Sequence, residues 1–157
     1  MSKQLRVFHR LQAAHSALFR AADRHLRDTV GLGNAQQTIL FMLMREDGLS
    51  LGSIARQLQL GKPGVSGLVD RLEAGGFAER RPDPDDARGV RLHILPAGRA
   101  AAQRAAPITK AINRELLAPF SESERDTIAR FLDHLAMQAE PIVASKVAAL
   151  SPERISS

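Results

Sequence analysis

The chain has 157 residues, and its 22 Lys and Arg residues outnumber its 17 Asp and Glu residues, which leaves a formal net charge of +5. Hydrophobic residues make up 44% and charged residues 25% of the sequence, a balance that provides a packed core and excludes a disordered chain. The absence of cysteine excludes disulfides, cysteine-ligated zinc sites and thiol redox sensors. The positive charge favours a polyanionic partner but does not indicate a fold.

Neither a leader segment nor a membrane span is predicted. The first six residues, MSKQLR, lead into a charged stretch rather than an apolar one. The longest apolar run, from Ile39 to Met44, is far too short to cross a bilayer. We therefore expect a cytoplasmic protein that makes no contact with a membrane.

A long amphipathic helix is predicted from Lys3 to about Thr29. Apolar residues recur there at helical spacing, no Pro or Gly interrupts them, and the helix would be roughly 40 Å long. A helix of that length extends beyond a small core, so its remaining apolar face needs another surface. This pattern indicates a partner chain.

Three shorter helices are predicted next. Asn34 is placed to cap a helix that runs to about residue 46, and Ser50 is placed to cap a helix over 51–59. A further helix is predicted over 63–74, where two glycines stop it. The apolar face of this helix consists of Val65, Leu68, Val69 and Leu72.

The pattern then changes from helical spacing to alternation. A short strand is predicted over 77–81, and a second over 90–94, where every other residue is apolar. Between them, residues 82–89 are rich in Pro, Asp and Gly and predict a charged loop.

Two further helices complete the predicted elements. The first begins at Pro96 and is expected to kink or shorten at Pro107. The second begins at the capping box Ser121–Glu124 and is expected to be disturbed at Pro141. We expect the tail after Leu150 to be frayed.

The order of these elements predicts a mainly α fold with a small β-hairpin wing. Two short helices in succession, followed at once by a charged hairpin, form the winged helix–turn–helix arrangement. The second helix of such a pair enters the major groove of DNA.

The same segments resemble the MarR (multiple antibiotic resistance regulator) family of winged helix–turn–helix transcriptional regulators. Residues 49–58 are similar to the first helix of the family's pair, and residues 65–80 are similar to its recognition helix and the entry to its wing. Residues 82–88 are similar to the wing, whose Asp-x-Arg hallmark is Asp86 and Arg88 here. The order and spacing of these fragments make the match more specific than any one of them.

The resemblance implies one MarR-like domain over 1–157. Within it, about 33–95 would form the winged helix–turn–helix, while 1–32 and 96–150 would supply N- and C-terminal dimerisation helices. It further implies a homodimer that binds a pseudo-palindromic operator in double-stranded DNA, as a repressor that a small-molecule effector releases. No cofactor is expected.

The sequence departs from the family's pattern after the wing. The family usually has Leu-Thr-x-x-Gly there, whereas this chain has Leu95 in the place of Thr. Leucine cannot cap a helix as Thr would, although Pro96 partly compensates because its ring presets φ. We expect a weaker helix start at this point.

A second departure lies in the first turn of the predicted recognition helix, where relatives often carry larger polar side chains. Lys62 and Ser66 supply the hydrogen-bonding side chains and are candidates for contact with base edges. Pro63, Gly64 and Gly67 lie beside them, and each glycine costs about 1 kcal/mol of helix propensity. Either the glycines let the helix backbone approach the groove, or they relieve crowding against a neighbouring helix.

The predicted wing supplies the remaining DNA-binding candidates. Arg88 is predicted to enter the minor groove, where negative potential favours a guanidinium, and Asp86 to orient it. Arg80 and Arg81 could meet phosphates or simply cover an exposed strand face. Arg71, on the outer side of the recognition helix, could contact a phosphate or pair with Glu73 or another acid.

Four apolar residues of the first two helices are candidates for a ligand-binding cleft between the dimer helices and the winged module. The alternative for each is ordinary core packing. They are Phe19, Ala22, Phe41 and Met42.

No catalytic or metal-binding motif is visible, so we expect neither an enzyme nor a metal site. None of the five histidines has i, i+4 spacing with another, and no nucleophile or phosphate-loop motif occurs. Two rivals to a DNA-binding regulator stay open. One is a winged-helix module whose basic wing docks an acidic protein, and the other is a helical dimer that binds a small molecule and has lost DNA recognition.

Overall fold

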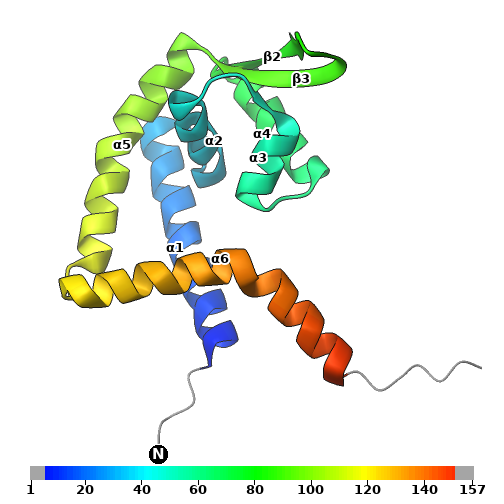
Figure 1. The fold of residues 1–157 in the computed structure, drawn as a ribbon. Coiled ribbons are helices and arrows are strands. Elements are labelled where there is room, and N and C mark those ends of the chain that lie inside the picture. Colours follow the sequence, from blue (N-terminus) through cyan, green and yellow to red (C-terminus); the bar gives the residue numbers. More distant parts are fainter. Residues whose placement is uncertain (1–5, 151–157) are drawn as a thin grey trace, which may run out of the picture. The chain divides into compact units, whose positions relative to one another are not determined.

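Six α-helices and three short β-strands make up residues 6–150, the part of the chain that this computed structural model describes (Figure 1). The mainly α fold with a small antiparallel sheet confirms the predicted fold class. The helices are α1 Val7–Val30, α2 Asn34–Arg45, α3 Leu51–Leu58, α4 Lys62–Ala74, α5 Pro96–Leu117 and α6 Glu122–Leu150. The strands are β1 Leu49–Ser50, β2 Ala78–Asp83 and β3 Asp86–Ile94.

The chain forms two compact units that divide within α5, between Thr109 and Lys110. The first unit contains α1 to α4, the sheet and the first part of α5. The second contains the end of α5 and all of α6.

The hydrophobic core lies in the first unit. The apolar face predicted for α4 is buried as expected, because its residues recur at helical spacing. This face packs with apolar residues of α2, α3 and the sheet, and alanines of α5 complete the cluster. The core residues with no more than 2% exposure are Leu32, Ile39, Leu40, Leu43, Ile54, Val65, Val69, Leu72, Ala78, Leu92, Ala101, Ala102 and Ala105.

The sheet has the order β1-β3-β2 and is antiparallel throughout. The prediction of a loop over 82–89 was wrong, because β2 continues to Asp83 and β3 begins at Asp86. Pro82 is tolerated because β2 is an edge strand, where a missing N–H disrupts little. The two-residue strand β1 was not predicted, since it is too short to show alternation.

The start of α2 differs from the prediction. Asn34 is the first helical residue rather than the cap, which is Gly33. The first amides of the helix find acceptors elsewhere: Gly33 N donates to Gln36 Oε1 at 3.1 Å, and Asn34 N donates to Asp23 Oδ1 of α1 at 3.0 Å. The cap is therefore partly tertiary, which explains why a local pattern did not predict it.

Helices α5 and α6 each contain an internal proline that does not end the helix. Helix α5 continues through Pro107 without interruption. Helix α6 begins at the predicted capping box, where Ser121 Oγ accepts from Glu124 N at 3.4 Å and Glu124 Oε2 accepts from Ser121 N at 2.8 Å. It continues through Pro141, and Figure 1 shows that the orange part of α6 is bent.

Two predictions fall partly or wholly outside the described residues: the helix start at Lys3 and the frayed tail after Leu150. In the range 6–150, no helix is both long and apolar enough to span a bilayer.

Candidate nucleic-acid interface

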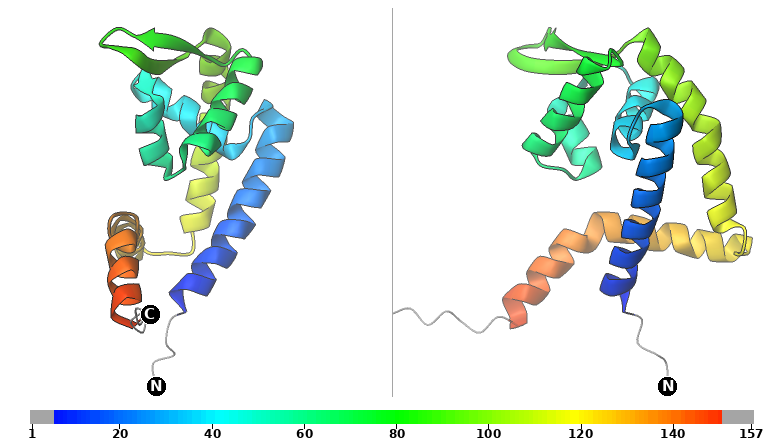
Figure 2. Two further views of the ribbon diagram at one scale, coloured as in Figure 1. Left: turned by 90° about the vertical axis from the view of Figure 1, so that its right-hand side faces the viewer. Right: turned by 180° about the vertical axis from the view of Figure 1, so that it is seen from behind.

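The helix pair α3–α4 and the β2–β3 hairpin together form one end of the first unit, from which the hairpin projects (Figure 2). Ser50 caps α3 as predicted, since its Oγ accepts from Ser53 N at 3.1 Å. Gln59 ends α3 in the left-handed conformation with φ 53°, which turns the chain sharply into α4. The arrangement is that of a winged helix–turn–helix.

The first turn of α4 lies on the surface. Lys62, Pro63, Gly64 and Ser66 are exposed and Gly67 is half-buried, whereas the core face of the helix points the other way. Proline is favourable at the start of a helix because its missing N–H would have no partner there. This turn is therefore available to a large partner.

Within residues 6–150, packing does not require either glycine of this turn. A Cβ at Gly67 would meet nothing within 4 Å, and a Cβ at Gly64 would meet Leu60 Cβ at an ordinary 3.8 Å. The alternative that the glycines relieve crowding against a neighbouring helix was wrong. Their helical cost of about 1 kcal/mol each has no compensation within the described residues.

The tip of the wing is a tight turn that its own carboxylates hold. Asp83 Oδ1 accepts from Asp85 N at 3.0 Å, and Asp86 Oδ1 accepts from Arg88 N at 2.9 Å. Asp86 thus fixes the backbone of Arg88 rather than its guanidinium. Arg88 is exposed, and none of the ion pairs found within residues 6–150 involves it.

Arg80 connects the wing to α4. Its guanidinium pairs with Asp70 at 2.7 Å and with Glu73, and its backbone N–H donates to Glu73 Oε1 at 2.7 Å. The hydrogen bond to Asp70, and the one to Glu73 after it, raise the pKa of Arg80 against the opposing effect of burial. Its neighbour Arg81 also has an acidic partner, since its Nε donates to Glu79 Oε1 at 2.7 Å.

Arg71 is exposed and takes part in none of the ion pairs within the described range. Glu73, one of the partners considered for it, binds Arg80 instead. Arg71 lies near enough to α1 to contribute to a lowered pKa of Asp23, after the larger effects of Arg27 and the Asn34 N–H.

A second set of contacts links the tip of the wing, through β3, to the turn before β1, and sequence reasoning missed it. Arg91 of β3 pairs with Asp83 of β2 at 2.9 Å and donates to Gly48 O at 2.9 Å. The N–H of Asp85 and the Arg91 guanidinium hold the pKa of Asp83 below its usual value. The contact between Arg91 and Gly48 spans 43 residues, so no local pattern could have shown it.

Asp47 ties the turn before β1 to the end of β3. Its carboxylate accepts from Ile94 N at 2.8 Å and lies 3.2 Å from His93 Nδ1. Burial raises the pKa of Asp47, but the Ile94 N–H, the His93 ring and the Gly48 N–H outweigh burial and hold this pKa below its usual value.

The four predicted ligand-binding residues separate into two groups. Ala22, Phe41 and Met42 are partly buried and pack against the core. Phe19 is 43% exposed and stacks on His15 with ring centroids 4.3 Å apart.

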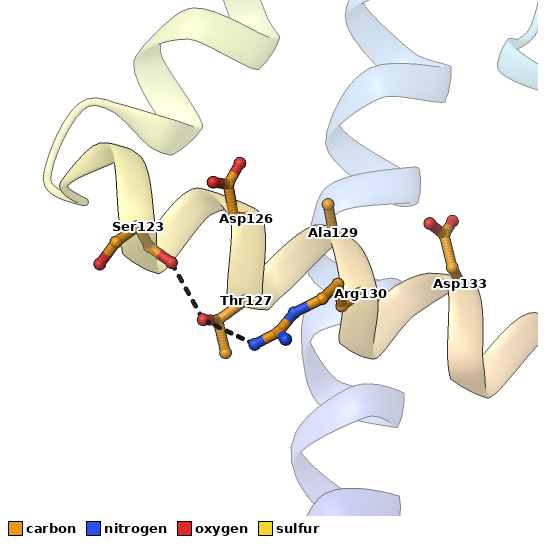
Figure 3. A pocket seen from close by; sticks show the side chains of 6 residues that line it. All are labelled: Ser123, Asp126, Thr127, Ala129, Arg130 and Asp133. Atoms are coloured by element: carbon orange, nitrogen blue, oxygen red, sulfur yellow. Dashed lines mark hydrogen bonds between the residues drawn. The ribbon is translucent and has the colours of Figure 1, made fainter.

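A shallow polar depression on α6 carries no ligand site. Its walls come from one helix face, residues 123–133, on which Thr127 Oγ1 donates to Ser123 O and Arg130 approaches Thr127 (Figure 3). A surface that one helix forms alone cannot enclose a small molecule. Over residues 6–150, no three His, Cys, Asp or Glu side chains are grouped to hold a metal ion.

Comparisons with known proteins give a consistent result. A sequence profile of the MarR family matches residues 30–89. The transcriptional activatory protein BadR of Rhodopseudomonas palustris is 30% identical over 120 residues, which cover 74% of this chain and 68% of that protein. The transcriptional repressor YetL of Bacillus subtilis is 25% identical over 107 residues, which cover 67% and 64%.

The fold also matches solved structures. The crystal structure of S. aureus MepR in complex with DNA superposes with a TM-score of 0.78 at 22% identity and covers 86% of this chain and 99% of that one. At that identity the likeness shows the fold, a winged helix with flanking helices.

Proposed function

The chain belongs to the MarR family of DNA-binding transcriptional regulators, and from this membership we propose that it reads a pseudo-palindromic operator as a homodimer. Helix α4 enters the major groove, and the β2–β3 wing lies along the neighbouring minor groove. Residues 33–95 read the DNA, and residues 1–32 and 96–150 hold the dimer.

The observation that carries the proposal is the exposed Arg88 at the tip of a projecting hairpin beside α4. Its backbone is held by Asp86 at 2.9 Å, while its guanidinium joins no ion pair in the described residues. A cation held out from the protein without an acidic partner suits the negative potential of a minor groove. Lys62 and Ser66, on the exposed turn of α4, supply base contacts in the adjacent major groove.

The dimer is supported by apolar side chains that the single chain leaves in solvent. Helix α6 has no buried residue, although apolar residues recur along it. Large apolar side chains of α1 are exposed as well. Because burying such a surface is favourable by roughly 25 cal/mol per Å², a second copy of the chain is its natural partner. The exposed residues are Phe8, Leu11, Leu18 and Phe19 of α1 and Phe131, Leu132, Met137, Ile142, Val143, Val147 and Leu150 of α6.

We further propose that the protein is a repressor released by a small effector, and that its activity is binding rather than catalysis. The exposed ring of Phe19, already stacked on His15, offers a flat apolar surface to an aromatic effector. Ala22, Phe41 and Met42 would line the inner side of that site.

The test is selection of bound duplexes from a random library with the purified full chain at moderate salt, followed by sequencing. The proposal predicts enrichment of an inverted repeat whose half-sites lie about one helical turn apart. If a folded, dimeric protein enriches nothing, DNA recognition is rejected and the chain becomes a small-molecule or protein-docking dimer.

A further inference from the structure

Arg80 of β2 contacts several side chains of α4. Its guanidinium lies 2.7 Å from Asp70 Oδ1, pairs with Glu73, and has its Nη2 3.5 Å from Ser66 Oγ. The side chain is only 27% exposed. One residue of β2 therefore binds three side chains of α4, spaced over two helical turns.

The two acids that Arg80 binds are unfavourable on a helix that approaches DNA. Asp70 and Glu73 place two negative charges on α4, and the phosphate backbone repels both. Lys62 and Arg71 are the basic residues of this helix, so its formal charges sum to zero without Arg80. A guanidinium between the two carboxylates lowers the local negative charge by one and orients both acids toward the protein.

Both Nη groups of Arg80 are engaged inside the protein. Nη1 donates to Glu73, Nη2 lies near Asp70 and Ser66, and the backbone N–H binds Glu73 Oε1. In contrast, Arg88 at the wing tip keeps its side chain clear of the acids of the described residues. The two arginines, eight residues apart, therefore serve DNA binding in different ways.

We propose that Arg80 is a positioning residue for DNA binding, which neutralises Asp70 and Glu73 and joins the wing to α4 as one rigid surface, rather than a direct phosphate contact. This inference rests on the proposed function. It deepens that function, because it explains the contribution of Arg80 to DNA affinity by the neutralisation of Asp70 and Glu73.

The test is a rescue experiment on the full chain with the selected duplex. Fluorescence anisotropy gives Kd for the wild type, for Arg80→Gln, for Asp70→Asn/Glu73→Gln, and for the three changes combined. We expect Arg80→Gln to weaken binding at least tenfold, and the combined variant to return to within threefold of the wild type or to bind more tightly. If the combined variant is as weak as Arg80→Gln, Arg80 contacts DNA directly and the inference is rejected.

The salt dependence of Kd is a second readout that a merely structural role would not move. Loss of a phosphate contact lowers the slope of log Kd against log salt by about one. We expect the combined variant to keep the slope of the wild type, because no phosphate contact is lost. A slope lowered by about one in that variant would overturn the inference.

Two controls separate folding from charge. Arg81→Gln is the matched control for Arg80→Gln, because Arg81 is the adjacent arginine and pairs with Glu79 instead of Asp70 or Glu73. Any loss of DNA affinity caused by Arg81→Gln should remain when Asp70→Asn and Glu73→Gln are added. If Arg80→Gln alone does not fold, Asp70→Asn/Glu73→Gln is compared with the combined variant, and equal Kd values support the inference while a tenfold difference rejects it. A wild type that binds no duplex at all would reject the proposed function itself.

Discussion

The winged helix–turn–helix and helix α6 use their apolar residues in opposite ways. In the winged part, Leu72 of α4 is 0% exposed and belongs to a core that the single chain completes. In α6, Leu132 is 50% exposed and Met137 is 74% exposed, and no residue of the helix is buried. The first region folds around its own core, whereas the second leaves its apolar side chains exposed. The contrast supports the proposed division of the molecule, in which each chain completes its own DNA-reading module and a second chain covers α6.

Replacing a leucine by alanine in each region should give the largest expected difference, measured as the change in the free energy of unfolding. Leu72→Ala leaves a cavity in a closed core and should lower the free energy of unfolding by about 2–5 kcal/mol. Leu132→Ala removes a half-exposed side chain and should cost less than about 1 kcal/mol of that free energy, but it should weaken the dimer. Chemical unfolding and sedimentation equilibrium of both variants check this. Equal losses of unfolding free energy would mean that α6 is packed within its own chain.

Introducing a charged side chain into α6 tests the proposed dimer interface directly. Leu132→Glu would place a carboxylate in the proposed dimer interface, at a cost of about 2 kcal/mol, or roughly a thirtyfold rise in the dimer dissociation constant. Leu60→Glu, at a similarly exposed leucine between α3 and α4, is the matched control and should leave the dimer intact. Sedimentation velocity over a dilution series measures both. A dimer unchanged by Leu132→Glu would remove this face of α6 from the interface.

Arg88→Ala tests the wing without touching either apolar region. We expect the affinity for the selected duplex to fall by about 1–3 kcal/mol, the usual cost of one specific contact, with the unfolding temperature unchanged. Arg114→Ala, which removes an exposed cation from the end of α5, is the control for net charge and should have a much smaller effect. An affinity unchanged by Arg88→Ala would take the wing tip out of the interface.

Gly67→Ala should move stability and DNA binding in opposite directions. The methyl group meets nothing within 4 Å, so helix propensity should raise the free energy of unfolding by about 1 kcal/mol. On the DNA-facing side the same methyl group would hold the α4 backbone away from the groove and weaken binding. Gly52→Ala in α3, which also has room, should stabilise the fold without this loss. Tighter binding by Gly67→Ala would contradict close approach of the backbone.

The smallest expected effect concerns Asp47, which ties the sheet to the turn before β1. Because the pKa of Asp47 is held below its ordinary value of 3.8, the ionised carboxylate stabilises the fold above about pH 4, and this contribution is lost as the pH falls through the lowered pKa. Unfolding free energies of the wild type and Asp47→Asn, measured from pH 7 to pH 3, should differ by a constant amount at neutral pH and converge in acid. A difference that grows as the pH falls would contradict the direction of the shift.

The features that local patterns predicted correctly are those made by residues close in sequence. The helix predicted over 63–74, the Ser50 cap and the Ser121 capping box each depend on contacts within four residues. The predicted cap at Asn34 failed because its acceptor, Asp23, lies 11 residues earlier on another helix. Residues 82–89 of the predicted hairpin were expected to form a loop because their prolines and aspartates favour one, although an edge strand tolerates proline.

The candidate site shows the same limit. Lys62, Ser66 and Arg88 were predicted and are exposed in the structure. The engagement of Arg80 with Asp70 and Glu73 was not foreseen, because it depends on how β2 docks on α4. Likewise, the contacts of Arg91 with Gly48 and of His93 with Asp47 join residues more than 40 positions apart. Ion pairs between separate elements can therefore be identified only when the fold is known.

The most direct measurement is the mass of the complex that the full chain forms with the selected duplex, compared with a duplex in which one half-site is scrambled. Native mass spectrometry with parallel binding curves gives the stoichiometry and affinity of both. A dimer that reads each half-site with one winged helix predicts two chains on the intact duplex and a large loss of affinity on the scrambled one. One chain on the intact duplex, bound equally well to either DNA, would contradict the division of the molecule into a DNA-reading region and a dimerising region.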